Sequence, residues 1–380
     1  MARKTSFVSA RQPRPDAAAS LRSLLGPVTR QHVDFKERLR AHYVTTERDQ
    51  ILKLEIELMI ENTVQRRNPA RPHGDDNRFE GTALAILAES GAGKSRAMLH
   101  YLESNDFFPN HGDTAGGCQL ITVGVKAPCT LRTLGMATLR AAGYQSRVEK
   151  RQNEAWPMAQ FQIQDQQILF VAYEEAQRII QQANRNERRE VIETLAGLMT
   201  DPVWPLSLIL SGLPELDGLF QKTFIDDDAN DRQRKAHITL RRRTRFLNFD
   251  PIDLDADRKD LDRGIREYQK LGGVSLELLK SAETRGRLHH AAGRQFGLFW
   301  ELIVLAIDIC VRSGRKVVTL DDFTDGYAGK TREPIELNPF AVDHWEAIDT
   351  DIVQRQPDAE EPLAGKPKGK PKPERRRGDA

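Results

Sequence analysis

The sequence lacks the features of secreted, zinc-binding and membrane-spanning proteins. Its three cysteines, Cys118, Cys129 and Cys310, are odd in number and far apart, which indicates neither a disulfide framework nor a zinc site. No run of about 18 or more apolar residues is present, so no membrane span is expected. Residues 1–20 contain no continuous apolar stretch, which argues against a secretory signal. These absences predict a cytoplasmic protein with three ordinary buried thiols and no membrane partner.

A strong overall charge is missing as well. Basic residues number 57 and acidic residues 55 in the 380-residue chain, for a net charge of +2. One segment departs from this balance, because residues 366–377 (KPKGKPKPERRR) carry seven positive charges and one negative charge. Such a segment is suited to a salt-sensitive contact with a polyanion such as DNA. A solubilising tail, or a tail that docks on an acidic partner, explains it equally well.

Short apolar segments alternate with helical patterns over the first part of the chain. Strands are predicted over residues 82–87, 120–126, 168–171 and 206–210. Helices are predicted over residues 96–102, 131–142 and 186–199, with a further helix that begins near Glu174. Strands that alternate with helices in this way indicate an α/β fold with a parallel, doubly wound sheet flanked by helices.

Composition divides the chain into four regions. They are a mobile N-terminal arm (1–30), an α/β nucleotide-binding domain with an N-terminal helical segment (31–250), an α-helical lid (251–330) and an extended, basic, disordered tail (331–380). The helical segment, residues 31–67, has one predicted apolar face formed by Ile51, Leu54, Leu58 and Met59. The lid contains a strongly apolar helix from Phe296 to Val311, and a capped helix begins near Asp321.

The segment 88–95 (AESGAGKS) lies between a predicted strand and a predicted helix, which is the context of a Walker A phosphate loop. Glycines allow successive backbone N–H groups to face one anion, and the helix N-terminus adds its dipole. Lys94 is expected to reach the β- and γ-phosphates of ATP, and the Ser95 hydroxyl to bind Mg²⁺. Ala88 replaces the first glycine of the motif, which requires a negative φ there. The expected nucleotide contacts of this segment are Ser90, Gly91, Ala92, Gly93, Lys94, Ser95 and Arg96.

Two adjacent carboxylates follow the third predicted strand. In ILFVAYEEAQ (168–177), Glu174 is predicted to face Mg²⁺ and Glu175 to activate the attacking water. Glu174 occupies a position that is ordinarily aspartate, and its extra methylene changes how it reaches the metal. An acidic pair that simply favours a helix N-terminus is the alternative interpretation.

Further residues are predicted to surround the γ-phosphate. Ser211 follows the fourth strand and is the nearest polar candidate between the phosphate loop and the acidic pair. Arg245, with Arg243 as second choice, is predicted to stabilise the transferred phosphate of a neighbouring subunit. Arg294 is predicted to fold over the nucleotide from the lid. The alternatives are an uninvolved turn for Ser211, a basic patch or DNA-backbone contact for the arginine cluster, and an ordinary helix start for Arg294.

The order of several short motifs resembles one known family. They are YVTTE (43–47), the phosphate loop, VKAP (125–128), LRTLG (131–135), AAGY (141–144), EEAQ (174–177), SGLPEL (211–216), Arg245 with Phe246, GRQFG (293–297) and GRKVVTLDDF (314–323). From about residue 35 to residue 325 the chain is similar to the TniB/TnsC-like AAA+ ATPases of DNA transposition. The chain departs from that family's pattern at Ala88, Glu174 and Leu213.

The resemblance implies an AAA+ P-loop NTPase fold with a small all-α lid, and ATP and Mg²⁺ as cofactors. It implies an ATP-dependent regulator that assembles on double-stranded DNA as a homo-oligomer, either a ring or a filament. Such a regulator recruits or activates a separate DDE-type transposase, with other transposition proteins, at target DNA. Two other functions stay open, namely a nucleotide-gated interaction module with little or no hydrolysis and another AAA+ or STAND-type signalling ATPase.

Overall fold

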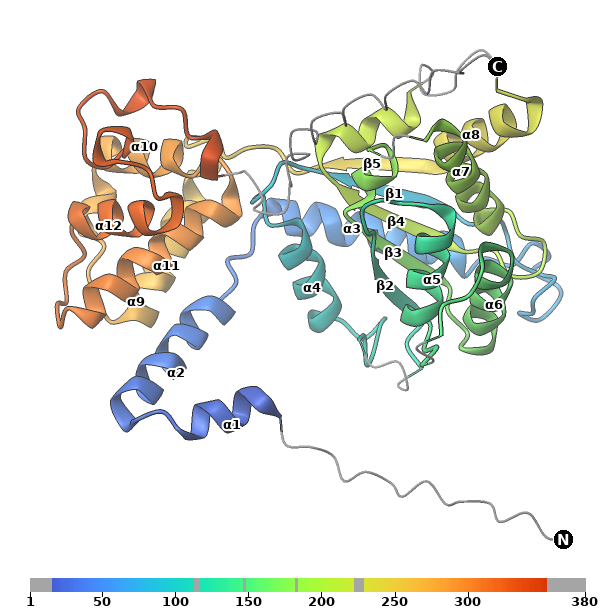
Figure 1. Cartoon of the computed structure of the whole chain (residues 1–380), viewed down its shortest axis with the longest axis horizontal. Helices are drawn as coiled ribbons and strands as arrows, with labels where there is room; N and C mark the ends of the chain where they lie inside the picture. Colours follow the sequence, from blue (N-terminus) through green and yellow to red (C-terminus); the bar gives the residue numbers. More distant parts are fainter. Residues whose placement is uncertain (1–15, 113–116, 146–147, 182–183, 222–228, 354–380) are drawn as a thin grey trace, which may run out of the picture.

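The protein has an α/β part and a helical part that lie side by side (Figure 1). The computed structural model describes residues 16–112, 117–145, 148–181, 184–221 and 229–353. The acidic loop before residue 229 and the basic segment 366–377 therefore lie outside the described residues. No helix in the described ranges is both long enough and apolar enough to cross a membrane.

The α/β part is built on a sheet of five parallel strands in the order β2-β3-β4-β1-β5. The strands are β1 (Ala83–Leu87), β2 (Leu120–Gly124), β3 (Phe170–Glu174), β4 (Ser207–Gly212) and β5 (Thr244–Asn248). Ser211 on β4 pairs in register with Ile86 on β1 and with Glu174 on β3. Because the strands are parallel, the phosphate loop after β1 and the polar residues that end β3 and β4 meet at one edge of the sheet.

The four predicted strands correspond to β1–β4 with small shifts, and the predicted parallel α/β sheet is confirmed. Strand β5 was not predicted, because its sequence TRFLN follows three arginines and has little apolar periodicity. This composition suits an edge strand, where charged side chains lie toward solvent.

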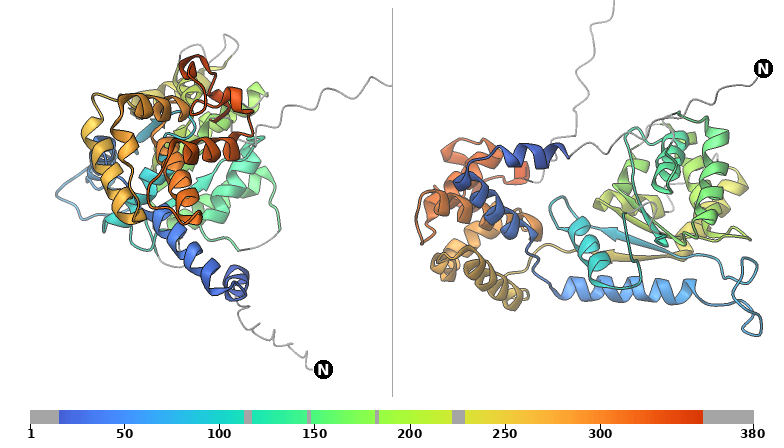
Figure 2. Two further views of the ribbon diagram at one scale, coloured as in Figure 1. Left: turned by 90° about the vertical axis from the view of Figure 1, so that its left-hand side faces the viewer. Right: turned by 90° about the horizontal axis from the view of Figure 1, so that it is seen from below.

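Helices cover both faces of the sheet (Figure 2). One face packs against α5 (Leu131–Ala141), α6 (Gln152–Asp165), α7 (Arg185–Met199) and α8 (Asp231–Arg243). The other face packs against α3 (Glu47–Thr63) and α4 (Lys94–Ser104). Alternate residues of β1 enter the two cores, with Ala85 in the first and Leu84 and Ile86 in the second, as the period of two in a strand requires.

Helix α3 buries only part of the predicted face, because Met59 is buried and Leu58 half-buried while the other two predicted residues are exposed. Ile51 is 41% exposed and Leu54 is 64% exposed, although both were predicted to be apolar contacts. The buried residues are Leu52, Ile56 and Met59. The apolar residues of α3 extend around much of its circumference, so the position of β1 and α4, and not the pattern alone, selects the face that is buried.

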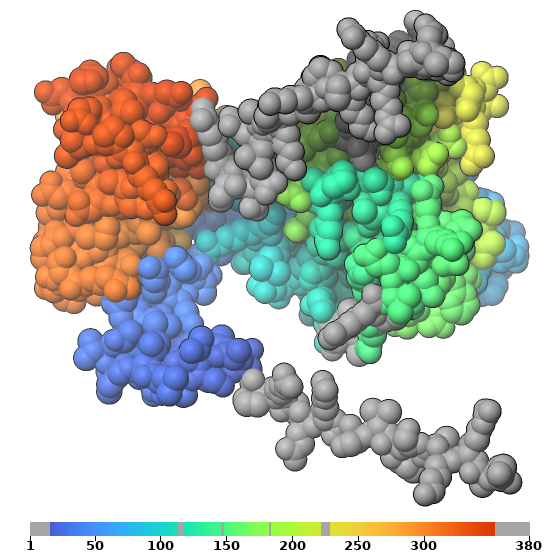
Figure 3. Space-filling model, viewed as in Figure 1, coloured from blue at the N-terminus to red at the C-terminus, as the bar shows by residue number. Residues whose placement is uncertain are grey.

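The N-terminal region is more ordered than the sequence suggested. Residues 1–30 were assigned to a mobile arm, of which 1–15 lie outside the described residues. The rest forms α1 (Ala17–Ser23) and the start of α2 (Pro27–Ala41), which project from the lid side of the molecule (Figure 3). Arg22 holds the two helices together, since its guanidinium contacts Glu37 at 2.7 Å and also Asp34.

Helix α2 packs against the lid. Leu39 of α2 belongs to the apolar core of the lid helices. The Asp308 carboxylate, 8% exposed, receives hydrogen bonds from Lys36 Nζ at 2.8 Å and from His32 Nε2 at 2.6 Å. Burial acts to raise the pKa of Asp308, but the contacts with Lys36 and His32 outweigh it and keep that pKa below its usual value. The segment 42–46, called the linker below, therefore joins a helix of the lid body to α3 of the sheet body.

The lid consists of α9 (Arg258–Gly272), α10 (Ala282–Ala291), α11 (Phe296–Arg312) and α12 (Leu320–Thr331). The predicted apolar helix corresponds to α11, and α12 begins with a capping box in which Thr319 N donates to Asp322 at 2.9 Å. Residues 331–353 were predicted to be an extended tail, but they pack on the lid. Phe340 is 2% exposed, and Arg287 donates to the carbonyls of Pro339 and Val342.

Candidate nucleotide-binding site

The phosphate loop connects β1 to α4 with the backbone that a phosphate site needs. Gly91 and Gly93 have φ values of 80° and 95°, in the left-handed region that glycine adopts without strain. Gly93 is the N-cap of α4, so the free N–H groups of the first turn face the loop. Ala88 does not have a positive φ, so alanine replaces the first glycine of the motif without backbone strain. The backbone fits an anion such as a phosphate.

Lys94 lies at the centre of this loop. Its Nζ donates to the carbonyl oxygens of Ala88 and Glu89. Burial lowers the pKa of Lys94 to about 8, while the negative charges of Glu175, Glu89 and Glu215 act in the opposite direction. Lys94 is therefore a half-buried cation held by two neutral carbonyl groups, and a phosphate anion would be a stronger partner.

Nucleotide affinity is expected to weaken at alkaline pH because of this lysine. Above pH about 8 the free protein loses the proton of Lys94, whereas bound phosphate keeps the lysine protonated, so binding takes up a proton. The dissociation constant for ATP should rise by up to about tenfold per pH unit above pH 8. Titrations with ATP between pH about 7 and about 9.5 measure this dissociation constant. Lys94→Arg stays charged over the whole range and should bind with a flat profile; a flat wild-type profile would contradict the prediction.

The two acidic residues lie where β3 ends. Glu174 is the last residue of the strand, and Glu175 has a φ of 58° before a short 3-10 turn, η1 (Ala176–Ile179). A 3-10 turn thus replaces the helix predicted near Glu174. Burial raises the pKa of Glu174, and the charge of Glu175 raises it further. A left-handed φ at a non-glycine residue costs free energy and is often found at functional sites.

Gln177 connects the acidic pair to the end of β4, a role that the sequence did not reveal. Its side chain is 2% exposed. Its Nε2 donates to Glu175 Oε2 at 2.9 Å, and its Oε1 accepts from the backbone N–H of Leu213 at 3.2 Å. Ser211 lies just before this turn, in register with Glu174. The structure therefore brings Glu174, Glu175 and Ser211 together at the C-terminal ends of the strands, where the phosphate loop also lies.

The predicted trans-acting arginines are in ion pairs within the chain. Arg245 forms a bidentate ion pair with Glu55. Its Nε lies 2.6 Å from Oε2 and its Nη2 lies 2.7 Å from Oε1 of the carboxylate. Arg243 forms an ion pair with Glu80. Arg245 pairs in register with Leu84, three residues before the end of β1, and so lies away from the phosphate loop of its own chain. An action on a neighbouring subunit stays a prediction.

The lid reaches the phosphate loop through the backbone at the start of α11, and a nucleotide contact of Arg294 stays a prediction. Arg294 is exposed, with a φ of 62°, in the turn before α11. At the start of α11, Leu298 N donates to Gly91 O at 3.2 Å. A Cβ at Gly297 would lie 2.5 Å from the same oxygen, so only glycine permits this approach. The contact makes the loop conformation depend on the position of the lid.

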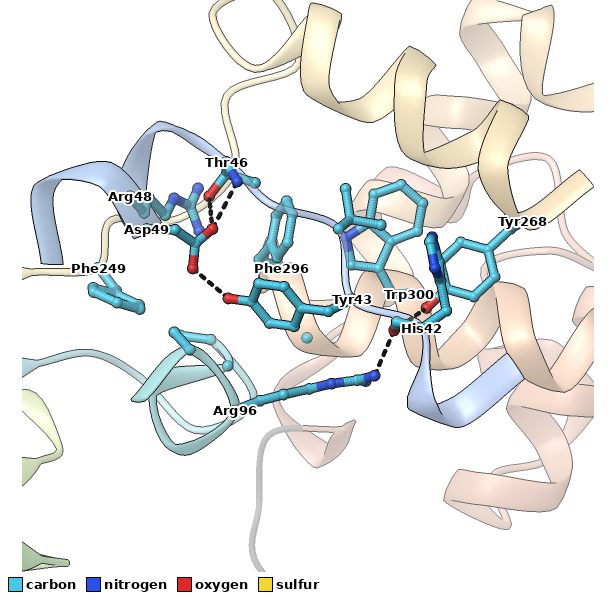
Figure 4. Close-up of a pocket in the computed structure, with 15 residues that line it drawn as sticks. His42, Tyr43, Thr46, Arg48, Asp49, Arg96, Phe249, Tyr268, Phe296 and Trp300 are labelled. Carbon is cyan, nitrogen blue, oxygen red and sulfur yellow. Dashed lines mark hydrogen bonds between the residues drawn. The ribbon is translucent and has the colours of Figure 1, made fainter. Parts of the chain in front are cut away.

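A pocket lined largely by aromatic side chains lies beside the loop, between the linker, α4 and the lid (Figure 4). Its cavity volume is about 40 Å³, and it is called the aromatic pocket below. Its lining residues are His42, Tyr43, Val44, Thr46, Arg48, Asp49, Ala92, Gly93, Arg96, Ala97, Phe249, Tyr268, Phe296, Gly297 and Trp300. The loop residues Ala92 and Gly93 are common to this pocket and to the phosphate site, so the two form one continuous binding region.

Arg96 holds a wall of the aromatic pocket. Its guanidinium donates to the carbonyl oxygens of Arg40 and His42, at the C-terminus of α2, and lies 5.8 Å from the ring centre of Tyr43. A cation at a helix C-terminus is favourable because it faces the negative end of the dipole. Arg96 was predicted to contact the nucleotide, but in this structure its charged end positions the linker.

The donor set also suits Mg²⁺. In the ranges that the structure describes, no group of three or more His, Cys, Asp and Glu side chains is arranged to hold a metal ion alone. Mg²⁺ in phosphate sites needs only one or two protein ligands, because phosphate oxygens and water complete its shell. Ser95 is exposed at the start of α4, and Glu174 has a raised pKa that a nearby cation would lower. These two residues fit the metal-binding role predicted for them.

Comparison with known proteins agrees with this geometry. Residues 77–220, which include the phosphate loop and the acidic pair, match the AAA domain family. No curated protein matches the chain. The solved structure of the Aeropyrum pernix ORC1 protein in complex with DNA has a TM-score of 0.52 and 12% identity, over 79% of this chain and 70% of that one. The ADP form of the ORC2 protein from Aeropyrum pernix has a TM-score of 0.49 and 11% identity, over 80% and 75%.

At these identities the similarity concerns the fold. The strand order, the phosphate loop after β1, the acidic pair after β3 and the helical lid agree with the family match. Residues 77–220 therefore carry an AAA domain, and the chain has the AAA+ P-loop fold with a helical C-terminal region.

Proposed function

We propose that the protein is an ATP-dependent regulator of DNA transposition. It binds ATP with Mg²⁺, assembles as a homo-oligomer on double-stranded DNA, and recruits or activates a separate DDE-type transposase at target DNA. The observation that carries the nucleotide part is the half-buried cation of Lys94, which lies in a glycine-bearing loop beside Glu175. The order of the TniB/TnsC-like motifs supports the transposition part.

The residues of the site have separate tasks in this proposal. Lys94 and the first N–H groups of α4 bind the phosphates, and Ser95 and Glu174 hold Mg²⁺, which neutralises phosphate charge. Glu175 accepts the proton of the attacking water. Gln177 keeps the Glu175 carboxylate in place through the 2.9 Å hydrogen bond.

The aromatic pocket holds the base and ribose. It adjoins the phosphate loop at Gly93, and its walls come from both the sheet body and the lid. A nucleotide in this position contacts α4, the linker and α11 at once. Binding would thus stabilise one arrangement of the lid, and of the α2 helix packed on it, relative to the sheet.

Two observations support a DNA-associated oligomer. The similar ORC1 protein of Aeropyrum pernix was solved in complex with DNA. In this chain α8 exposes Lys235, Arg241 and Arg242, and the seven-residue spacing places Lys235 and Arg242 on one face of the helix. Such a basic strip is suited to phosphate groups of DNA or to an acidic surface of the next subunit. The segment 366–377 is a further candidate contact outside the described residues.

A nucleotide-gated interaction module is the second candidate. Two features favour it, namely the glutamate at position 174 and the ion pair that holds Arg245 on Glu55. In this alternative ATP stabilises one conformation and is turned over little or not at all.

The deciding experiment measures ATP hydrolysis by the full chain with and without double-stranded DNA, with molecular mass followed by light scattering. Turnover and assembly that rise only when ATP and DNA are both present are the expected result. Tight ATP binding with no turnover and no response to DNA would contradict the regulator and support the nucleotide-gated module. Transposition assays with a DDE-type transposase would then test the partner.

A further inference from the structure

Helix α1 exposes an apolar face that the described part of the chain does not cover. Leu21 is 67% exposed, Leu24 is 80% exposed, and Val28, just after the turn into α2, is 80% exposed. None of the seven residues of α1 is buried. Its charged residue, Arg22, faces α2 instead and pairs there with two carboxylates. An amphipathic helix ordinarily turns its apolar side chains toward the protein, so this face of α1 is available to another molecule.

Helix α3 carries a second uncovered apolar stripe. Ile51 and Leu54 are exposed and Leu58 is half-buried, and their spacing of three and four residues places them on one side of the helix. Glu55 lies next to this stripe, and its charge is neutralised by the bidentate ion pair with Arg245. Covering the stripe therefore leaves no unpaired charge at its centre, which would otherwise oppose the contact.

The two apolar faces match each other. Ala17, Leu21 and Leu24 repeat at intervals of four and three residues, so α1 and α3 present stripes of the same length, about 10 Å. Helices pack together by fitting such rows of side chains into one another. Their borders differ in charge, because exposed Arg30 follows the α1 face and exposed Glu61 borders the α3 stripe. Within one chain α1 projects from the lid side, away from α3, so the matching stripe is that of a second copy (Figures 1 and 2).

We propose that the apolar face of α1 in one copy packs on the α3 stripe of the next copy. The inference rests on the proposed function, since it needs a chain that assembles on DNA. The two surfaces are different, so the contact is heterologous, and its repetition joins copies into a ring or a filament. A contact between two such short stripes is much smaller than a stable interface, which buries about 1,600 Å². The contact therefore strengthens an assembly that forms on DNA and does not hold two free copies together.

The test places opposite charges on the two faces. Leu24→Glu and Leu54→Lys each put an unpaired charge into the contact. Each variant alone should need about a tenfold or higher protein concentration to assemble on double-stranded DNA with ATP, as measured by light scattering. An equal mixture of the two should assemble at nearly the wild-type concentration, because the two introduced charges of opposite sign then face each other. Such recovery in a mixture cannot come from changes within a single chain.

Ile335→Glu is the matched control, since Ile335 is 62% exposed on the segment that packs on the lid and belongs to neither face. It should assemble as wild type does. All three variants change exposed side chains outside the phosphate site, so each should bind ATP with wild-type affinity. Titration with ATP thus verifies that every variant is folded before its assembly is compared.

Two different failures are distinguishable. Wild-type assembly by Leu24→Glu alone or by Leu54→Lys alone would overturn the contact between α1 and α3. A mixture that assembles no better than its two components would overturn it as well. A wild-type chain that binds ATP but does not assemble on DNA would overturn the proposed function, and the contact with it.

Discussion

Replacing Lys94 with alanine is expected to weaken ATP binding by about 30-fold or more, since loss of one partner of a buried charge pair costs about 2 to 5 kcal/mol. The cation lies within the loop that Gly91 and Gly93 shape. The alanine variant removes a partly buried charge that burial already disfavours, so its folding should not suffer. Calorimetric titration with ATP and Mg²⁺ measures the loss.

Lys259→Ala is the matched control for this variant. Lys259 is exposed on α9 and does not line the aromatic pocket. It should bind ATP as wild type does. Wild-type affinity in Lys94→Ala would show that the loop after β1 is not the phosphate site, and the proposed function would fail with it.

The second large effect is expected from Glu175→Gln. Binding of ATP should be retained within a few-fold, while turnover falls by about 100-fold or more, because an amide cannot accept the proton of the attacking water. The substitution preserves the size of the side chain and leaves a carbonyl oxygen to accept from Gln177. Phosphate release under saturating ATP, with ATP binding measured in parallel, separates the two quantities. The proposed regulator should accumulate in its assembled, ATP-bound form.

Glu57→Gln is a suitable control, since Glu57 lies on α3 and contacts the exposed Lys53 at 3.8 Å. Its turnover should match that of wild type. If Glu175→Gln hydrolysed ATP at the wild-type rate, another group would have to activate the water. A wild-type chain without measurable turnover would instead support the nucleotide-gated module.

Local patterns in the sequence predicted the parts of the site that are contiguous in the chain. The phosphate loop, the acidic pair and Ser211 each lie at the end of a strand, and parallel strands bring such ends to one edge of the sheet. The same reasoning predicted α11 from its helical periodicity and α12 from its capping residues. It failed for β5 and for the buried face of α3, where neighbouring elements select which residues are covered.

Side-chain partners that are distant in sequence were beyond such reasoning. Arg245 and Glu55 are separated by 190 positions, and nothing local distinguishes that arginine from a free one. Arg96 resembles a phosphate ligand by its place after Ser95, yet its charged end faces the carbonyls at the end of α2. Gln177 connects the acidic pair to the end of β4 because its Oε1 accepts a hydrogen bond from the backbone N–H of Leu213, the residue after β4.

The sequence by itself determined the class of the fold and the chemistry of phosphate binding, because both depend on short-range periodicity and on the backbone freedom of adjacent glycines. The tertiary structure decided which side chains meet beside the phosphate loop. The aromatic pocket takes its walls from the linker, α4, the end of β5 and the lid, and Arg48 and Trp300 meet there from positions about 250 residues apart. Only the packing of the lid against the sheet body brings these two residues together.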